Sequence, residues 1–222
     1  MQDGWSNTPL SEFALVILGA FGLFIVVGLF GLFDPGPSEP YAAADLRFLL
    51  VYEVAVFLTL ALILRSRGRD LASIDMRPSL GGTIDGVALA VLAQLVFLLI
   101  LNVLALTMPQ LLPQIDATPA GAPGIGLGLL VAALLVNSVF EELFVTGYVV
   151  SVLQGRYSAW TAINASVAIR MAYHLYQGGI GVINIIPTGL IFAIWFARRG
   201  TLWPLIAAHT LINLYAFLAS AE

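Results

Sequence analysis

With 222 residues, 60% of them hydrophobic and 10% charged, the chain has too little polar surface to cover a soluble globule, so we expect an integral membrane protein. It contains no cysteine, which excludes disulfides, thiolate metal sites and a cysteine nucleophile, and no lysine, which excludes a serine–lysine catalytic dyad. The net charge of -4 excludes little, because in membrane proteins the placement of basic residues matters more than their sum.

Seven apolar segments approach the roughly 20 residues that a helix needs to cross the ~30 Å hydrocarbon core. They lack the period-2 alternation of transmembrane barrel strands. We therefore predict an all-α fold, a polytopic transmembrane helix bundle with flanking spans in residues 1–110 and a C-terminal four-helix core in 125–219. We expect one integral membrane domain over 1–222. The first apolar run follows no positively charged segment and is interpreted as a retained span. The expected spans are 12–33, 44–64, 82–107, 125–150, 159–176, 181–197 and 202–219.

The linkers between these spans alternate in kind. "DPGPSEPYAAAD" and "MPQLLPQIDATPAGAPG" are rich in proline and glycine and contain no arginine. The remaining linkers are rich in arginine, and the positive-inside rule places them in the cytoplasm, which predicts an inside N-terminus and an outside C-terminus. We expect the membrane to be a bacterial or archaeal plasma membrane. All nine basic residues are arginine, and seven of them lie in the other linkers: Arg65, Arg67, Arg69, Arg77, Arg156, Arg198 and Arg199.

Away from the ends of the expected spans six ionisable residues remain, with Asp85 near an end, and such a group at the centre of a span costs ~2.5 to 3.5 kcal/mol on insertion scales. Glu53 stands alone, and we interpret it as a protonated or hydrogen-bonded carboxyl. The others lie in three clusters within the C-terminal four spans, "EELF", "RMAYH" and "HTLIN". These five residues are Glu141, Glu142, Arg170, His174 and His209.

Helical geometry predicts that the clusters meet. If the fourth and fifth spans form a hairpin turning at "LQGRYSA", its centre lies 16 residues after Glu141 and 17 before His174, so both side chains reach the same depth. Arg170 lies one helical turn before His174 and shares its face. His209 and Asn213 are likewise one turn apart on the last span.

This set of groups has the composition of a hydrolase. A buried carboxylate beside an imidazole can hold a water molecule and take its proton. An imidazole and a carboxamide on one helix turn, His209 and Asn213, can donate hydrogen bonds to the oxyanion that forms when water attacks an amide. Ser138 and Ser166 lie nearby, but no G-x-S-x-G elbow frames either, so we interpret both as helix-packing residues.

A zinc site is the alternative chemistry. Glu141, His174 and His209 could supply the His₂Glu set of a catalytic zinc. However, no H-E-x-x-H helix is present, and scattered single ligands are weak evidence for a metal. The expectation is therefore a site without a metal or other cofactor, with zinc as the minority alternative.

The three clusters resemble the motifs of the CAAX prenyl endopeptidase and bacteriocin-processing (CPBP) family of intramembrane proteases. That family has a Glu-Glu-x-x-x-Arg motif, a Phe-x-x-x-His motif some thirty residues later, and a His-x-x-x-Asn motif on a later helix. The corresponding segments here are "EELFVT", "RMAYH" and "HTLIN", and the "LWPLIAAHTLIN" surroundings also look like the family. The resemblance covers residues 136–214.

The resemblance implies an endopeptidase that cuts near the C-terminus of a membrane-anchored or lipidated protein or peptide. In such an enzyme Glu141 and His174 would activate the water, and His209 and Asn213 would form the oxyanion hole. Glu142 would be a supporting carboxylate that the motif arginine neutralises. The family is usually described as using a glutamate and no metal. The partners implied are the substrate and the lipid bilayer, with no nucleic acid.

The chain departs from the family pattern at two positions. Thr146 occupies the place of the motif arginine, and Arg170 occupies the place of the motif phenylalanine. A buried carboxylate without a partner is destabilising by several kcal/mol. We therefore hypothesise that Arg170 approaches Glu142, or bridges both carboxylates, from the facing helix.

Two other classes of function remain open. A catalytically silent membrane scaffold or immunity protein would keep the fold and bind a partner, and the missing motif arginine favours this reading. A proton-coupled carrier would use the buried carboxylates and histidines as a relay. Against a carrier stands the absence of an inverted repeat in the sequence.

Overall fold

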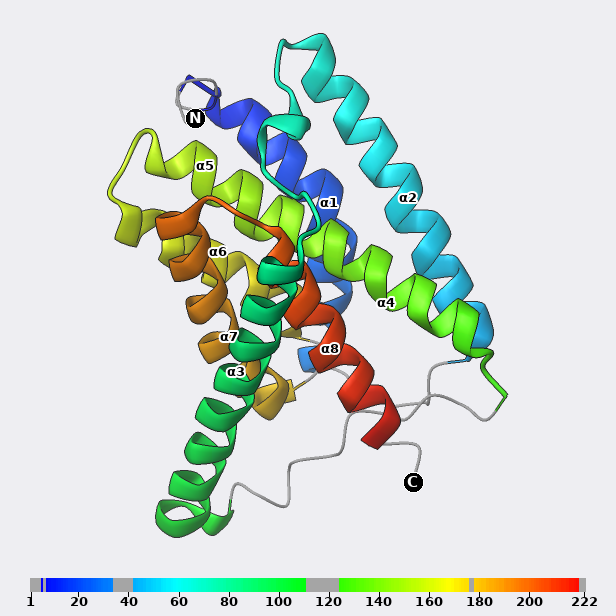
Figure 1. Ribbon diagram of the computed structural model, residues 1–222, viewed down its shortest axis with the longest axis vertical. Helices are drawn as coiled ribbons and strands as arrows, with labels where there is room; N and C mark the ends of the chain where they lie inside the picture. The colour runs from blue at the N-terminus through cyan, green and yellow to red at the C-terminus, as the bar shows by residue number, and fades with distance from the viewer. Residues whose placement is uncertain (1–4, 6, 34–41, 111–123, 176–177, 220–222) are drawn as a thin grey trace.

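The computed structural model describes residues 5, 7–33, 42–110, 124–175 and 178–219 (Figure 1). Each of the seven predicted spans is helical, which confirms the all-α class, and the fourth consists of three consecutive helical segments. The predicted end of the fifth span at residue 176 lies outside the described residues, as does most of the two arginine-free linkers. The elements are α1 (Leu10–Phe33), α2 (Ala43–Ser66), η1 (Leu71–Ser73), α3 (Leu80–Thr107), α4 (Leu127–Glu141), η3 (Glu142–Tyr148), α5 (Val149–Gln154), α6 (Ala159–Tyr173), α7 (Gly178–Arg199) and α8 (Trp203–Ala219).

The outer helices present apolar side chains to their surroundings. Four described helical stretches are long and apolar enough to cross a membrane: Leu10–Gly31, Ala43–Ser66, Leu80–Thr107 and Leu127–Gln154. Large hydrophobic side chains on α1, α2 and α3 are exposed, in the manner of surfaces that contact lipid. The chain is therefore an integral membrane protein, and the stretch formed by α4, η3 and α5 is the most buried of these four.

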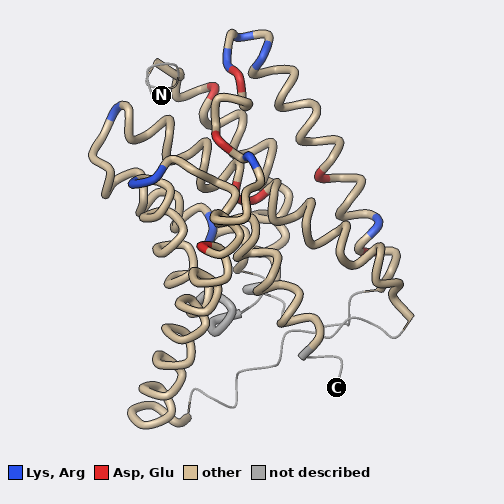
Figure 2. The backbone as a smooth tube through the Cα atoms, in the orientation of Figure 1, with Lys and Arg blue, Asp and Glu red and all other residues tan. Residues whose placement is uncertain are grey.

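The arginine-rich linkers and the start of α1 lie on one side of the bundle. Glu12, in the first turn of α1, lies 3.4 Å from Arg69 in the α2–α3 linker. Arg156, in the α5–α6 turn, donates to a backbone carbonyl just ahead of α1 at 3.1 Å. The Leu202 amide donates to the Asp75 carbonyl at 2.7 Å and joins the α2–α3 and α7–α8 linkers. Figure 2 shows most basic residues at helix ends in the upper half of the view and a small group of opposite charges at the centre. The linkers that are rich in arginine in the sequence thus lie together on one face of the molecule.

The fourth span differs from the regular helix that the sequence predicts. Residues 142–148 form the π-helical segment η3, and all seven are buried. Ser166 on α6 donates to the Val145 carbonyl at 2.6 Å, which stabilises the irregular turns. Ser166 thus joins two helices as predicted, whereas Ser138 donates to the Leu134 carbonyl of its own helix at 2.8 Å. Single-turn π segments in helices occur often at functional sites.

Close packing of α3 on α8 fixes the helix that carries His209 and Asn213. Gly86 on α3 lies against the first turns of α8, and an added Cβ would lie 2.7 Å from the Pro204 carbonyl oxygen and 2.8 Å from Ala207 Cβ. The first neighbour is a backbone atom of α8, and the second is the whole side chain of an alanine. Only glycine therefore fits at this crossing.

We predict that Gly86→Val lowers the stability of the purified protein by about 1–3 kcal/mol, because overpacking must separate α3 from α8. Thermal unfolding in detergent measures this change. Gly81→Val on the same helix is the matched control, because an added Cβ there meets nothing within 4 Å. Equal unfolding temperatures for the two variants would contradict the packing described.

Candidate active site

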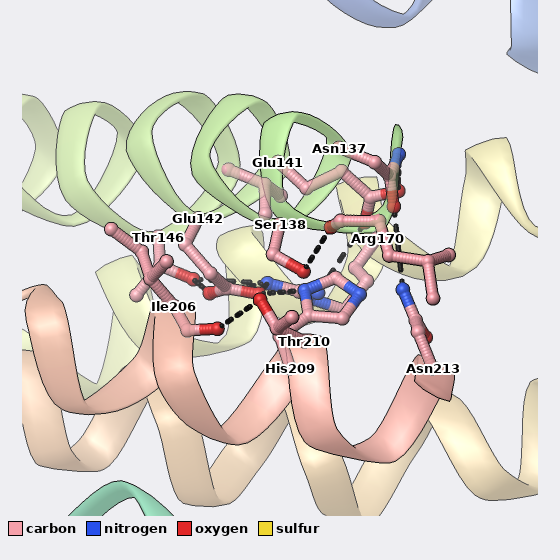
Figure 3. Close-up of polar contacts among 12 residues, drawn as sticks. Asn137, Ser138, Glu141, Glu142, Thr146, Arg170, Ile206, His209, Thr210 and Asn213 are labelled. Carbon is pink, nitrogen blue, oxygen red and sulfur yellow. Dashed lines mark hydrogen bonds and ion pairs between the residues drawn. The ribbon is translucent and has the colours of Figure 1, made fainter. Parts of the chain in front are cut away.

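Glu142 is the centre of the buried polar network and has no exposed surface. Arg170 Nη2 donates to its two carboxylate oxygens at 2.7 and 2.8 Å, and Thr146 Oγ1 donates to Oε2 at 2.8 Å. His209 Nδ1 lies 2.7 Å from Oε1 (Figure 3). Three helical elements, η3, α6 and α8, therefore supply a complete set of partners to one carboxylate.

The contact hypothesised for Arg170 is present. Besides its bonds to Glu142, its Nη1 lies 3.6 Å from Glu141 Oε2, so the guanidinium faces both carboxylates. Arg170 Nη2 also donates to Thr146 Oγ1 at 3.1 Å. The side chain is 2% exposed. A cation from the facing helix thus pairs with Glu142, and the Thr146 hydroxyl completes the set.

Glu141 has a different environment from its neighbour. Its oxygens accept hydrogen bonds from Asn137 Nδ2 at 3.1 Å and from Tyr173 Oη at 2.5 Å. It keeps 8% of its surface exposed, whereas Glu142 keeps none. Glu141 is thus the carboxylate of the pair that retains an accessible edge.

His174 lies at the C-terminal end of α6 and is 7% exposed. Its Nδ1 is 2.9 Å from the Arg170 carbonyl oxygen, which can only accept, so Nδ1 carries a proton and donates. In the neutral imidazole the lone pair then lies on Nε2. Tyr173, the preceding residue, bonds to Glu141, so the hairpin brings these two segments to the same depth as predicted. A carboxylate and an imidazole lone pair in this arrangement can take a proton from water.

The two predicted oxyanion donors lie one turn apart on α8. Glu142 accepts from Arg170 as a carboxylate, so His209 Nδ1 must be the donor in their contact. His209 can donate a second hydrogen bond through Nε2 only as an imidazolium. Asn213 Nδ2 lies 3.4 Å from Asn137 Oδ1, and the two carboxamides point toward each other in Figure 3.

Three residues of the network were not predicted from the sequence. Tyr173 and Asn137 bond Glu141, and Asn137 Nδ2 also donates to Glu53 Oε1 at 2.7 Å. Glu53 is a hydrogen-bonded carboxyl, as interpreted above, but its connection to the site was missed. Asn137 lies one turn before Glu141, and that spacing was the available signal. Tyr173 gave no signal beyond its place next to His174.

The metal alternative has no preformed ligand set within the described residues. No three His, Asp or Glu side chains of that part of the chain lie close enough together to hold a metal ion. Glu141 and His174 use atoms in the contacts above, and His209 is directed to Glu142. A zinc bound by Glu141, His174 and His209 would require these side chains to rearrange.

Residues 123–215 match the family model described as Rce1-like, type II CAAX prenyl endopeptidase. The matched segment runs from the start of α4 almost to the end of α8 and contains the three motif segments. Comparison with curated proteins and with solved structures gives no match.

We predict that Arg170→Phe, which introduces the phenylalanine of the motif that this segment resembles, destabilises the protein by about 3–5 kcal/mol, because it leaves Glu142 buried without its cation. Adding Thr146→Arg supplies a cation from the same helix as Glu142 and should restore most of the loss. Arg77→Phe, at an exposed arginine whose side chain is 89% accessible, is the control for replacing arginine by phenylalanine. Thermal unfolding of the three variants and wild type provides the test, and a stable Arg170→Phe protein would count against the role of the ion pair.

Proposed function

We propose, because residues 123–215 match the Rce1-like family model and contain the three motif segments, that the chain is an intramembrane endopeptidase that hydrolyses a peptide bond near the C-terminus of a membrane-anchored or lipidated substrate. One observation carries the assignment of roles. Of two adjacent glutamates, Glu142 is fully buried among four bonds from three side chains, while Glu141 keeps an accessible edge beside the His174 segment. The first holds the helices together, and the second performs the chemistry.

In the proposed reaction a water molecule lies between Glu141 and His174. Its oxygen forms a bond to the scissile carbonyl carbon as its proton passes to Glu141 or to Nε2 of His174. The tautomer fixed by the Arg170 carbonyl leaves Nε2 able to accept that proton. When the C–N bond breaks, the same proton passes to the departing amine. The products are a carboxylic acid and an amine, and the reaction needs no further reactant.

The oxyanion of the tetrahedral intermediate is stabilised from α8. Asn213 Nδ2 donates to it, as does His209 Nε2 while the ring is an imidazolium paired with Glu142. Such donors are effective in a site that excludes water, and each contributes on the order of 10²–10³ in rate. The Glu142 network therefore supports catalysis by keeping the His209 ring oriented.

The proposed orientation places the arginine-rich face in the cytoplasm. The chain has no native cysteine, so single-cysteine variants report on this directly. Ser66→Cys lies at the arginine-rich face and Gly126→Cys lies ahead of α4 at the other end of the spans. An impermeant maleimide added to intact cells should label Gly126→Cys and leave Ser66→Cys unlabelled until the membrane is permeabilised. The opposite pattern would reverse the topology.

We predict that Glu141→Ala and His174→Ala each lower the rate of cleavage of a membrane-anchored CAAX-type substrate by at least about 10²-fold, because each removes part of the water-activating pair. The assay uses purified protein reconstituted in vesicles with the substrate. Asp85→Ala is the control, since Asp85 is an exposed carboxylate on α3. Activity that a chelator leaves unchanged fits this mechanism, whereas loss with chelator and recovery with zinc would favour the metal alternative. Equal rates in wild type and both site variants would overturn the proposed function.

A further inference from the structure

Glu53 is a buried carboxyl that the proposed mechanism does not use. It lies near the middle of α2, outside the segment matched by the family model, and it is 1% exposed. Its Oε1 accepts a hydrogen bond from Asn137 Nδ2 at 2.7 Å. Its Oε2 is buried without a hydrogen-bond partner in the described part of the chain, and no described cation forms an ion pair with it. A glutamate held only by one amide in an apolar span requires an explanation, because an apolar residue would cost less there.

Asn137 joins Glu53 to two groups of the candidate active site. The two hydrogens of its Nδ2 go to different carboxyl groups, Glu53 Oε1 at 2.7 Å and Glu141 Oε1 at 3.1 Å. Its Oδ1 faces Asn213 Nδ2 at 3.4 Å. One carboxamide therefore connects α2 with the proposed water activator on α4 and with a proposed oxyanion donor on α8.

The contact with Glu53 determines which way this carboxamide faces. A reversed Asn137 amide would place its oxygen against the Glu141 carboxylate and its NH₂ group against the NH₂ group of Asn213, and both contacts would be repulsive. Glu141 alone occupies one of the two N–H groups. Glu53 supplies the second acceptor on the same side and so favours the orientation observed.

Glu53 performs this role best as the neutral acid. A second carboxylate would share the Asn137 amide with ionised Glu141, and like charges at such close range disfavour each other. Arg170 faces Glu141 and Glu142, not Glu53. In the neutral form the carbonyl oxygen of Glu53 accepts from Asn137, and Oε2 carries the proton.

We propose that Glu53 is a positioning residue of the active site: through Asn137 it holds the Glu141 carboxylate and the Asn213 carboxamide in their working orientations. The proposal rests on the proposed function, and it makes α2 part of a site whose other members lie within residues 123–215. It distinguishes the acceptor oxygen of Glu53, which is needed, from its negative charge, which is not.

The test compares Glu53→Gln, which keeps an acceptor oxygen, with Glu53→Met, which keeps the shape and removes it. In the reconstituted cleavage assay Glu53→Gln should retain activity within about threefold. Glu53→Met should lower kcat by about 10- to 100-fold with little change in KM, the size of effect expected when reacting groups are displaced by about 1 Å. Thr59→Val is the control on α2, because the Thr59 hydroxyl is exposed and bonds only to the Ala55 carbonyl within its own helix.

A double variant tests whether Glu53 acts through Asn137. Because Asn137→Leu removes the bridge, adding Glu53→Met to it should lower kcat no further. The double variant also removes the one Asn137 N–H that Glu53→Met leaves buried without an acceptor, so it provides a comparison if the single variant folds poorly. Unchanged kcat in Glu53→Met, loss of activity in Glu53→Gln equal to that in Glu53→Met, or fold-losses that multiply in the double variant would each overturn the proposal. If wild type and Glu53→Met both cleave, and equally well, this inference alone is overturned. If the wild-type protein does not cleave, the proposed function is overturned.

Discussion

The structure depends on an ion pair inside an apolar helix bundle. Arg170 and Glu142 are 2% and 0% exposed, and a charge in such a place is costly unless its partner and hydrogen bonds are arranged closely around it. Arg170 meets this requirement from α6, Thr146 from η3 and His209 from α8. The pair therefore specifies how three helical elements of the C-terminal core must sit. An alternative packing would leave a charge in the membrane interior without a partner.

The remaining polar groups follow from this arrangement. Neighbouring residues on a helix point about 100° apart, so Glu141 cannot share the environment of Glu142 and turns toward Asn137 and Tyr173. The hydrogen bond that each histidine makes through Nδ1 sets which atom is left for chemistry. At His174 the partner is a backbone carbonyl, which suits a base, and at His209 it is a carboxylate, which orients the ring as a donor. In the account proposed here, one glutamate holds the helices and the other activates water.

The sequence was sufficient for the fold class, for the positions of the spans and for the contact between Arg170 and Glu142, because each depends on apolar length, helical spacing or the cost of an unpaired charge. The π-helical segment η3 was not predicted, since no pattern in its sequence distinguishes it from an α-helix and Ser166 stabilises it from another helix. The bridge from Glu53 through Asn137 depends on how α2 packs against α4. Since α2 is apolar on most of its surface, its pattern does not show which face meets α4, and Glu53 stood alone.

The most direct test of the division of labour measures both unfolding temperature and cleavage rate for Glu141→Gln and Glu142→Gln. Each variant replaces one carboxylate by an amide of the same shape. The account predicts that Glu141→Gln unfolds close to wild type and loses cleavage by about 10²-fold or more. Glu142→Gln should instead unfold at a clearly lower temperature, because Arg170 loses its buried counter-charge. Full activity in Glu141→Gln, or wild-type stability in Glu142→Gln, would contradict the account.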